Sequence, residues 1–124
     1  HSPALSNGDL VIDTASHRVY LHGSVLDMSD TEVRFLEVLA RNIGHVVTYA
    51  DLLSQVWGTE DHSGGKDMIK TTAYRVRRSL GEEGRRYIHS VRGEGYTMPH
   101  LAESTSSDAA GPQPAAVRRT APRW

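Results

Sequence analysis

One segment, residues 66–80, constrains the fold of this chain more than any other. Its apolar positions recur at intervals of four, three and four residues and are occupied by Ile69, Ala73, Val76 and Leu80. At 3.6 residues per turn, this spacing aligns them in a narrow stripe along one side of an α-helix. We therefore predict a helix that packs on a core along this stripe and ends at Gly81.

The rest of this helix is cationic. Residues 66–78 contain one acid, Asp67, and five basic residues, which are Lys66, Lys70, Arg75, Arg77 and Arg78. The formal net charge of the whole chain is only −1, because its acids are gathered elsewhere. Salt screens charges beyond roughly 8–10 Å, so the local patch matters more than the sum. The patch favours a nucleic-acid partner, although a charged helix face taken alone is more often simply solvated.

A first helix is predicted upstream, after Ser29. Ser29 or Asp30 can cap it, and Glu32 follows Ser29 by three residues, which is the spacing of a capping box. Gly44 stands where the end of this helix favours a positive φ. The apolar residues of this helix recur at helical spacing and are Val33, Leu36, Leu39, Ala40 and Ile43.

A second, shorter helix lies between these two. Thr48 and Asp51 form the cap pair that opens it. The apolar side of this helix consists of Leu52, Leu53, Val56 and Trp57. Residues 58–65 include three glycines and two acids, so they are predicted to form a loop that leads to the cationic helix.

Strands are predicted on both sides of the helices. Residues 9–13 and 18–22 alternate apolar and polar side chains, and residues 25–26 begin a third short strand. Residues 86–91 and 96–98 are predicted to form a hairpin around the glycine-rich turn between them. The predicted fold class is therefore α+β, with an N-terminal antiparallel sheet, three helices and a C-terminal β-hairpin.

One domain is expected over residues 8–100, because a chain of 124 residues suffices for one domain and not comfortably for two. Residues 1–7, which begin with His1, are expected to be tag or linker. Residues 101–124 are rich in Ser, Ala, Pro and Gly and lack aliphatic periodicity, so a disordered tail is predicted there.

The composition argues against several classes of function. The chain has no cysteine, which excludes disulfides, thiolate metal sites and a cysteine nucleophile. Its seven histidines include no pair four residues apart, and no glycine loop has nucleotide-binding spacing, so neither metal nor cofactor is expected. No nucleophile is paired with a base, so we do not predict an enzyme. No apolar run approaches the roughly 18 residues of a membrane span, and a cytoplasmic protein is expected.

A cationic helix followed by a glycine-tipped hairpin is an arrangement that can dock on duplex DNA. An α-helix fits the major groove, where each base pair presents a distinct set of donors and acceptors. A cation at a hairpin tip can reach the neighbouring minor groove. Specific binding of double-stranded DNA is therefore the leading prediction. The alternative is a protein-interaction module of the same fold, whose third helix docks a protein instead of DNA.

Three motifs resemble those of OmpR/PhoB-type effector domains of bacterial response regulators. Residues 26–33, Leu-Asp-Met-Ser-Asp-Thr-Glu-Val, resemble L-x-L-T-x-x-E-F at the start of the family's first helix. Residues 52–58, Leu-Leu-Ser-Gln-Val-Trp-Gly, resemble L-L-x-x-V-W-G. Residues 87–96, Tyr-Ile-His-Ser-Val-Arg-Gly-Glu-Gly-Tyr, resemble Y-I-x-T-V-R-G-x-G-Y, the most specific of the three. Their order and spacing imply a winged helix-turn-helix over residues 8–100.

This resemblance implies a DNA-binding transcription regulator of a two-component system. Residues 66–80 would be its recognition helix in the major groove, and the hairpin would be a wing that places Arg92 in the minor groove. The DNA-binding residues that the resemblance and the helix face imply together are Lys66, Met68, Lys70, Thr71, Tyr74, Arg75, Arg77, Arg78, Ser90 and Arg92.

Three of these positions carry reservations. Arg77 flanks the apolar stripe, so a packing or salt-bridge role stays open beside a phosphate contact. Tyr74 stands where the family commonly has Arg, and Met68 where it commonly has Thr. These departures leave the binding mode of the family in place and affect the target sequence.

Two further partners are implied. The loop before the recognition helix occupies the place that contacts RNA polymerase in some family members. Its acids Glu60 and Asp61 would be repelled by phosphate, so we predict a polymerase contact there, with a solvated connector as the alternative. One domain of this size buries little area on DNA, so tight binding is expected to need self-association on tandem or paired half-sites.

Overall fold

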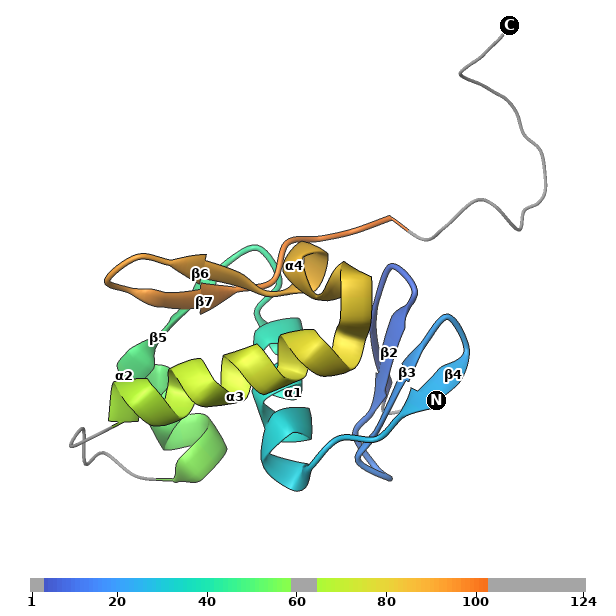
Figure 1. Ribbon diagram of the computed structural model, residues 1–124, viewed down its shortest axis with the longest axis horizontal. Coiled ribbons are helices and arrows are strands. Elements are labelled where there is room, and N and C mark those ends of the chain that lie inside the picture. Colours follow the sequence, from blue (N-terminus) through green and yellow to red (C-terminus); the bar gives the residue numbers. More distant parts are fainter. Residues whose placement is uncertain (1–3, 59–64, 103–124) are drawn as a thin grey trace, which may run out of the picture.

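The computed structural model describes residues 4–58 and 65–102 of the 124-residue chain. Its elements are shown in Figure 1. In chain order they are β1 (Ala4–Asn7), β2 (Leu10–Asp13), β3 (Arg18–Leu21), β4 (Ser24–Leu26), α1 (Asp30–Arg41), β5 (Val46–Thr48), α2 (Tyr49–Leu52), the π-helical segment η1 (Leu53–Trp57), α3 (Gly65–Leu80), the 3₁₀ turn η2 (Gly81–Glu83), α4 (Gly84–Tyr87), β6 (His89–Val91) and β7 (Gly95–Thr97).

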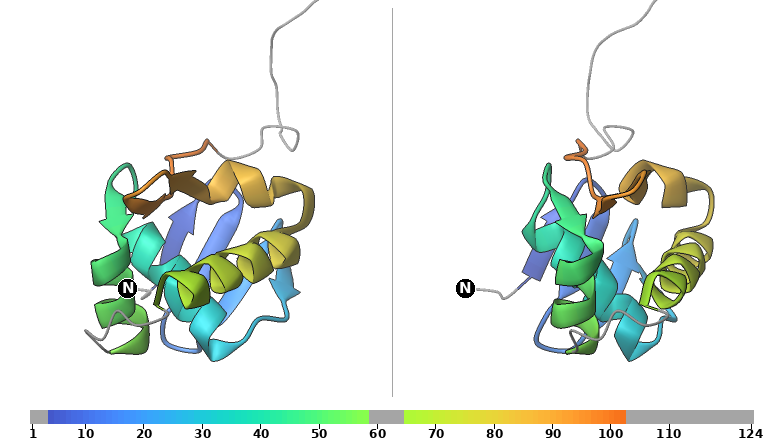
Figure 2. Two further views of the ribbon diagram at one scale, coloured as in Figure 1. Left: turned by 60° about the vertical axis from the view of Figure 1, so that its left-hand side comes forward. Right: turned by 90° about the vertical axis from the view of Figure 1, so that its left-hand side faces the viewer.

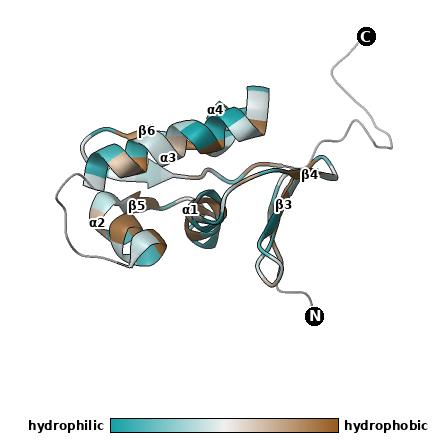
Figure 3. Cartoon of the chain, turned by 60° about the horizontal axis from the view of Figure 1, so that its bottom comes forward, coloured by the Kyte–Doolittle hydropathy of each residue, from teal (hydrophilic) through white to brown (hydrophobic). Residues whose placement is uncertain are grey.

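Two antiparallel sheets flank the helices. The N-terminal sheet has the order β1-β2-β3-β4, and the second sheet has the order β5-β7-β6. In the N-terminal sheet Leu10 faces Leu21 and Ile12 faces Val19, which puts all four buried side chains on the face that packs on α1. α1 lies at the centre, and the right-hand view of Figure 2 shows α3 at the opposite edge of the molecule from the first strands. The mixed colouring of α3 in Figure 3 reflects its apolar and polar positions. The predicted α+β architecture is confirmed.

Local caps fix both ends of the central helix. The Ser29 hydroxyl accepts from the Glu32 N–H at 3.2 Å, and the Glu32 carboxylate accepts from the Ser29 N–H at 3.1 Å, so the predicted capping box is present. The helix ends at Arg41 and is capped by Asn42, whose N–H donates to the Leu39 carbonyl and whose side chain donates to the Val38 carbonyl at 2.8 Å. Gly44, in the turn that follows, takes the predicted positive φ of 85°. Thr48 likewise caps α2, because its hydroxyl accepts from the Asp51 N–H at 3.1 Å.

The N-terminal sheet begins at Ala4, before the domain start predicted at residue 8, because β1 pairs with β2 along its whole length. The buried Asn7 side chain holds the other end of the domain to this strand: its amide donates to the Pro99 carbonyl at 2.8 Å and accepts from the Leu101 N–H at 2.7 Å. Leu101, predicted to start the tail, packs against the core. These contacts join residues far apart in the chain, which is why local periodicity did not indicate them. Residues 103–124 of the predicted tail lie outside the described residues.

The strand predicted over residues 86–91 is wrong in its first half. The chain turns at Gly81, where φ is 71°, and forms η2 and α4 before β6 begins at His89. Gly84 packs so closely on α3 that a Cβ there would lie 2.5 Å from the Arg77 carbonyl oxygen. Tyr87 is 1% exposed, and its hydroxyl accepts from the Asp9 N–H at 3.1 Å. Tertiary packing of Gly84 and Tyr87 thus overrides the strand-like pattern.

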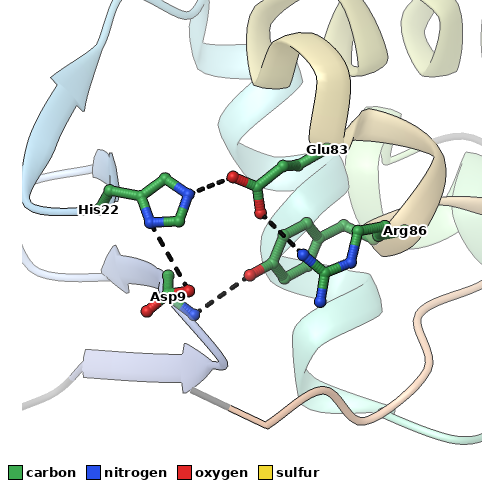
Figure 4. A network of polar contacts seen from close by, with 5 residues as sticks. Asp9, His22, Glu83 and Arg86 are labelled. Carbon is green, nitrogen blue, oxygen red and sulfur yellow. Dashed lines mark hydrogen bonds and ion pairs between the residues drawn. The ribbon is translucent and has the colours of Figure 1, made fainter. Parts of the chain in front are cut away.

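A polar cluster joins the N-terminal sheet to the corner after α3 (Figure 4). The His22 ring, in the turn between β3 and β4, hydrogen-bonds Glu83 through Nε2 and lies 3.5 Å from the Asp9 carboxylate through Nδ1. Arg86 contacts the other Glu83 oxygen at 3.3 Å. The hydrogen bond to Glu83 raises the pKa of His22 above its ordinary value of 6.5, and the negative charges of Glu83 and Asp9 act in the same direction.

Replacing His22 with Asn is expected to destabilise the domain in a pH-dependent way. Because the pKa of His22 is raised in the folded state, its protonated form stabilises the fold fully below pH 6.5, and the benefit is lost as pH rises through the raised pKa. Melting temperatures of wild type and His22→Asn, measured from about pH 5.5 to 8.5, should therefore converge as pH rises. His45→Asn, at an exposed histidine outside the cluster, is the control. A difference that does not change with pH would contradict this role for His22.

Candidate nucleic-acid interface

α3 buries its apolar stripe and leaves its other sides exposed. Ile69, Ala73 and Val76 are fully buried and Leu80 is nearly so, which confirms the predicted core face. Seven residues predicted to bind DNA are exposed on the same helix, namely Lys66, Met68, Lys70, Thr71, Tyr74, Arg75 and Arg78. The predicted Ser90 and Arg92 are exposed on the C-terminal hairpin. The cationic helix surface is therefore free for a partner, as far as the described residues reach.

One row of side chains projects directly away from the core. Each member precedes a member of the buried stripe by two residues, which is about 200° around a helix. The row consists of Asp67, Thr71, Tyr74 and Arg78. Asp67 was not among the predicted site residues, although this offset from the stripe places it in the same row. A helix inserted in a groove would present this row first to the floor of the groove.

The side of α3 that faces the hairpin is tied to it. Arg77 donates from Nε and Nη2 to the Ile88 carbonyl at 3.2 and 3.0 Å, and its guanidinium carbon lies 5.8 Å above the Tyr96 ring. Lys66, at the start of the helix, places its ammonium 5.2 Å above the Tyr49 ring. The sequence left open whether Arg77 packs or contacts phosphate; these contacts favour packing.

The hairpin projects from a well-anchored base. β7 pairs with both β5 and β6, and Gly95 approaches β5 so closely that a Cβ there would lie 2.0 Å from the Val47 carbonyl oxygen. The Tyr49 N–H donates to the Glu94 carbonyl at 3.0 Å, and the Glu94 N–H closes the turn on Val91 at 2.9 Å. Gly93 supplies the positive φ, 76°, at the tip. This geometry leaves Arg92 exposed at the end of a short, supported hairpin.

Acids line the opposite flank of α3. A hollow of about 450 Å³ separates the helix from the start of α1 and from Trp57, and Glu32 and Asp67 are among its lining residues. A neighbouring hollow of about 380 Å³ is lined by Asp27, Glu32, Arg75, Arg78 and Ser79. Carboxylates repel phosphate, so this flank disfavours a nucleic-acid backbone. Lys66 and Lys70 lie on the flank toward the hairpin, whereas Arg75 lines both hollows of the acidic flank.

The remaining predictions concern a polymerase contact, metal binding and membrane spans. Glu60 and Asp61, predicted to contact RNA polymerase, lie outside the described residues. Within residues 4–58 and 65–102, no cluster of histidine and carboxylate side chains is placed to hold a metal ion. No helix in those ranges combines the length and the apolar character needed to cross a membrane.

Comparison with known proteins identifies the same kind of domain throughout. Residues 23–98 match the family described as "Transcriptional regulatory protein, C terminal". The response regulator MprA of Mycobacterium sp. (strain KMS) is 32% identical over 97 residues, which cover 78% of this chain and 42% of MprA. This chain thus matches less than half the length of that curated relative.

Solved structures share the fold. The DNA-binding domain of CpxR from E. coli superposes with a TM-score of 0.69 at 29% identity, covering 82% of this chain and all of that one. The DNA-binding domain of RstA from Klebsiella pneumoniae, solved in complex with the RstA box, gives a TM-score of 0.66 at 25% identity, covering 78% of this chain and 97% of that one. The three-helix body and C-terminal hairpin are therefore a winged helix.

Arg77→Ala is expected to lower the stability of the domain by about 1–3 kcal/mol, because it leaves the Ile88 carbonyl without its donor and removes the contact with Tyr96. The matched control is Arg78→Ala, which removes the same charge from the next, exposed position and should leave stability nearly unchanged. Chemical denaturation measures both. Equal stability of the two variants would show that Arg77 does not anchor the hairpin.

Proposed function

The chain belongs to the family of C-terminal domains of transcriptional regulatory proteins, and from this we propose that it binds specific sequences of double-stranded DNA as the effector domain of an OmpR/PhoB-type response regulator. One observation carries the proposal. α3 exposes four basic side chains, Lys66, Lys70, Arg75 and Arg78, beside a firmly anchored hairpin whose tip is Arg92. This pairing of surfaces suits two adjacent grooves of a duplex.

In the proposed complex α3 lies in the major groove. Its outer residues, Thr71 above all, approach the base edges, since a helix in this groove presents its outermost row to them. Arg75 lies beside that row and carries the two parallel donors that suit guanine. Met68 offers an apolar contact for a thymine methyl group. These side chains would therefore supply the sequence preference.

Phosphate contacts are assigned to two lysines of α3 and to one serine of the hairpin. Lys66 and Lys70 lie on the flank of α3 toward the hairpin, and Ser90 is exposed on β6. Contacts of this kind set affinity and orientation without reading sequence. Arg92, at the hairpin tip, would enter the minor groove, where a narrow A·T-rich segment concentrates negative potential. Arg77 donates to the Ile88 carbonyl within the domain, so the proposed complex gives it a packing role in place of a DNA contact.

The proposal extends to partners beyond DNA. We place RNA polymerase at Glu60 and Asp61, which precede α3 in the sequence and whose negative charges disfavour phosphate. We place a second copy of the domain on a tandem or paired half-site, because one such domain buries too little area for tight binding. Both partners meet the protein in the cytoplasm, where bacterial DNA lies.

Selection from a pool of random duplexes tests the proposal. A DNA-binding domain should enrich one motif, and its affinity for that motif should fall steeply as salt is added. The logarithm of the association constant should fall against the logarithm of the salt concentration with a slope of about −0.9 per phosphate neutralised. A protein-interaction module would enrich no motif and show little salt dependence on duplex DNA. That result would overturn the proposal.

Arg75→Ala is expected to weaken binding to the selected duplex by about 1–3 kcal/mol and to leave binding to random duplexes almost unchanged, because a base-reading arginine contributes discrimination more than general attraction. Fluorescence anisotropy on both duplexes measures the difference. Arg18→Ala, which removes an exposed charge from β3 on the N-terminal sheet, is the control. Equal weakening on both duplexes would make Arg75 a phosphate contact.

Arg92→Ala is expected to weaken binding mainly on duplexes with an A·T-rich segment beside the major-groove site. A narrow minor groove attracts an inserted guanidinium, and Gly93 lets the turn present this side chain at its tip. The measurement compares wild type and variant on two duplexes that differ only in that flanking segment. If the affinity of the variant falls by the same factor on both duplexes, or does not fall on either, Arg92 does not read the minor groove.

A further inference from the structure

Tyr74 and Arg78 form a pair on the outermost row of α3. They lie four residues apart, so one stands above the other on the same side of the helix. The guanidinium carbon of Arg78 lies 5.8 Å above the centre of the Tyr74 ring. Tyr74 is 59% exposed, one of the few large hydrophobic side chains left at the surface of the described residues. The Tyr74 ring is therefore little stabilised by burial, and its contact with the Arg78 guanidinium is the ring contact found for it.

We propose that Tyr74 positions Arg78 to read a guanine in the major groove, so that the two residues act as one specificity element. This inference rests on the proposed function, and it requires a guanine in the target sequence at the position that Arg78 contacts. Tyr74 is the positioning residue, and Arg78 is the residue that touches the base.

The chemistry of the guanidinium supports this division of roles. Its N–H donors lie in one plane and radiate outward, so contact with an aromatic ring leaves donors available. Among the described residues, no carboxylate or carbonyl oxygen forms a hydrogen bond or an ion pair with Arg78. A long arginine side chain held in place before binding loses less conformational freedom when it binds. Arg78 is therefore prepared for a partner outside the chain.

The surrounding charges favour a neutral partner over a phosphate. Arg78 lines a hollow beside Arg75, and two acids, Asp27 and Glu32, line it as well. Their carboxylates weaken the attraction of this region for an anionic backbone. Guanine presents two neutral acceptors, O6 and N7, at the spacing that an arginine fork matches. Adenine replaces the O6 acceptor with a donor, so a purine without O6 would not satisfy the same fork.

The experiment uses the duplex motif enriched by the selection described above and replaces each guanine in turn by 7-deazaguanine, in which C–H takes the place of the N7 acceptor. Wild type should lose roughly tenfold in affinity at one particular guanine, in line with the value of a bidentate contact. Arg78→Ala should be weaker overall and insensitive to that replacement. Tyr74→Phe, which keeps the ring, should retain the full sensitivity, whereas Tyr74→Leu, which keeps apolar bulk alone, should lose most of it.

Two results would overturn the inference. If Arg78→Ala keeps the wild-type response at every guanine, Arg78 contacts phosphate or nothing. If Tyr74→Leu responds as strongly as wild type, Arg78 reads its base without help from the ring. Both residues are exposed, so the melting temperatures of the variants should match wild type and exclude misfolding as the cause. Failure of the proposed function is distinct, because wild type would then enrich no motif in the selection.

Discussion

The burial of one narrow stripe of α3 against the core determines how the whole surface of this domain is arranged. Ile69, Ala73 and Val76 are fully enclosed, and burial of Ile69 and of Val76 contributes about 1.5–3 kcal/mol each through the hydrophobic effect. A rotation of the helix would expose them, so the opposite row is held outward. The partner-facing surface is thus a consequence of packing on α1, and it exists before any partner binds.

A second constraint fixes the hairpin relative to that helix. Arg77 donates from α3 to the carbonyl of Ile88, just before β6, and Tyr96 of β7 lies under the same guanidinium. β7 is also paired with β5, where Gly95 leaves no room for a side chain. The exposed arginine at the tip therefore keeps a set distance from the helix, which a two-groove binding mode requires. On the flank toward α1 the acids Asp27 and Glu32 lie beside Arg75 and Arg78, whereas Lys66 and Lys70 lie on the flank toward the hairpin.

The sequence predicts those features that depend on neighbours along the chain. The Ser29–Glu32 capping box, the Thr48 cap and the stripe of α3 each depend on spacings of three or four residues, and all are present. Features that depend on distant partners were missed or left open. Asn7 is buried only because the segment around Pro99 returns to it, and residues 84–87 form a helical turn because Tyr87 is drawn into the core. The inward role of Arg77 could not be decided without its acceptor.

The central claim is that the outer row of α3 and the hairpin tip form one surface for duplex DNA, and nuclear magnetic resonance tests it most directly. Backbone amide and arginine side-chain resonances of the domain would be followed while the selected duplex is added. The account predicts that the largest changes fall on Thr71, Tyr74, Arg75, Arg78 and Arg92, with little change over β1–β3 on the far side of α1. Changes concentrated on the N-terminal sheet, with α3 unaffected, would contradict it.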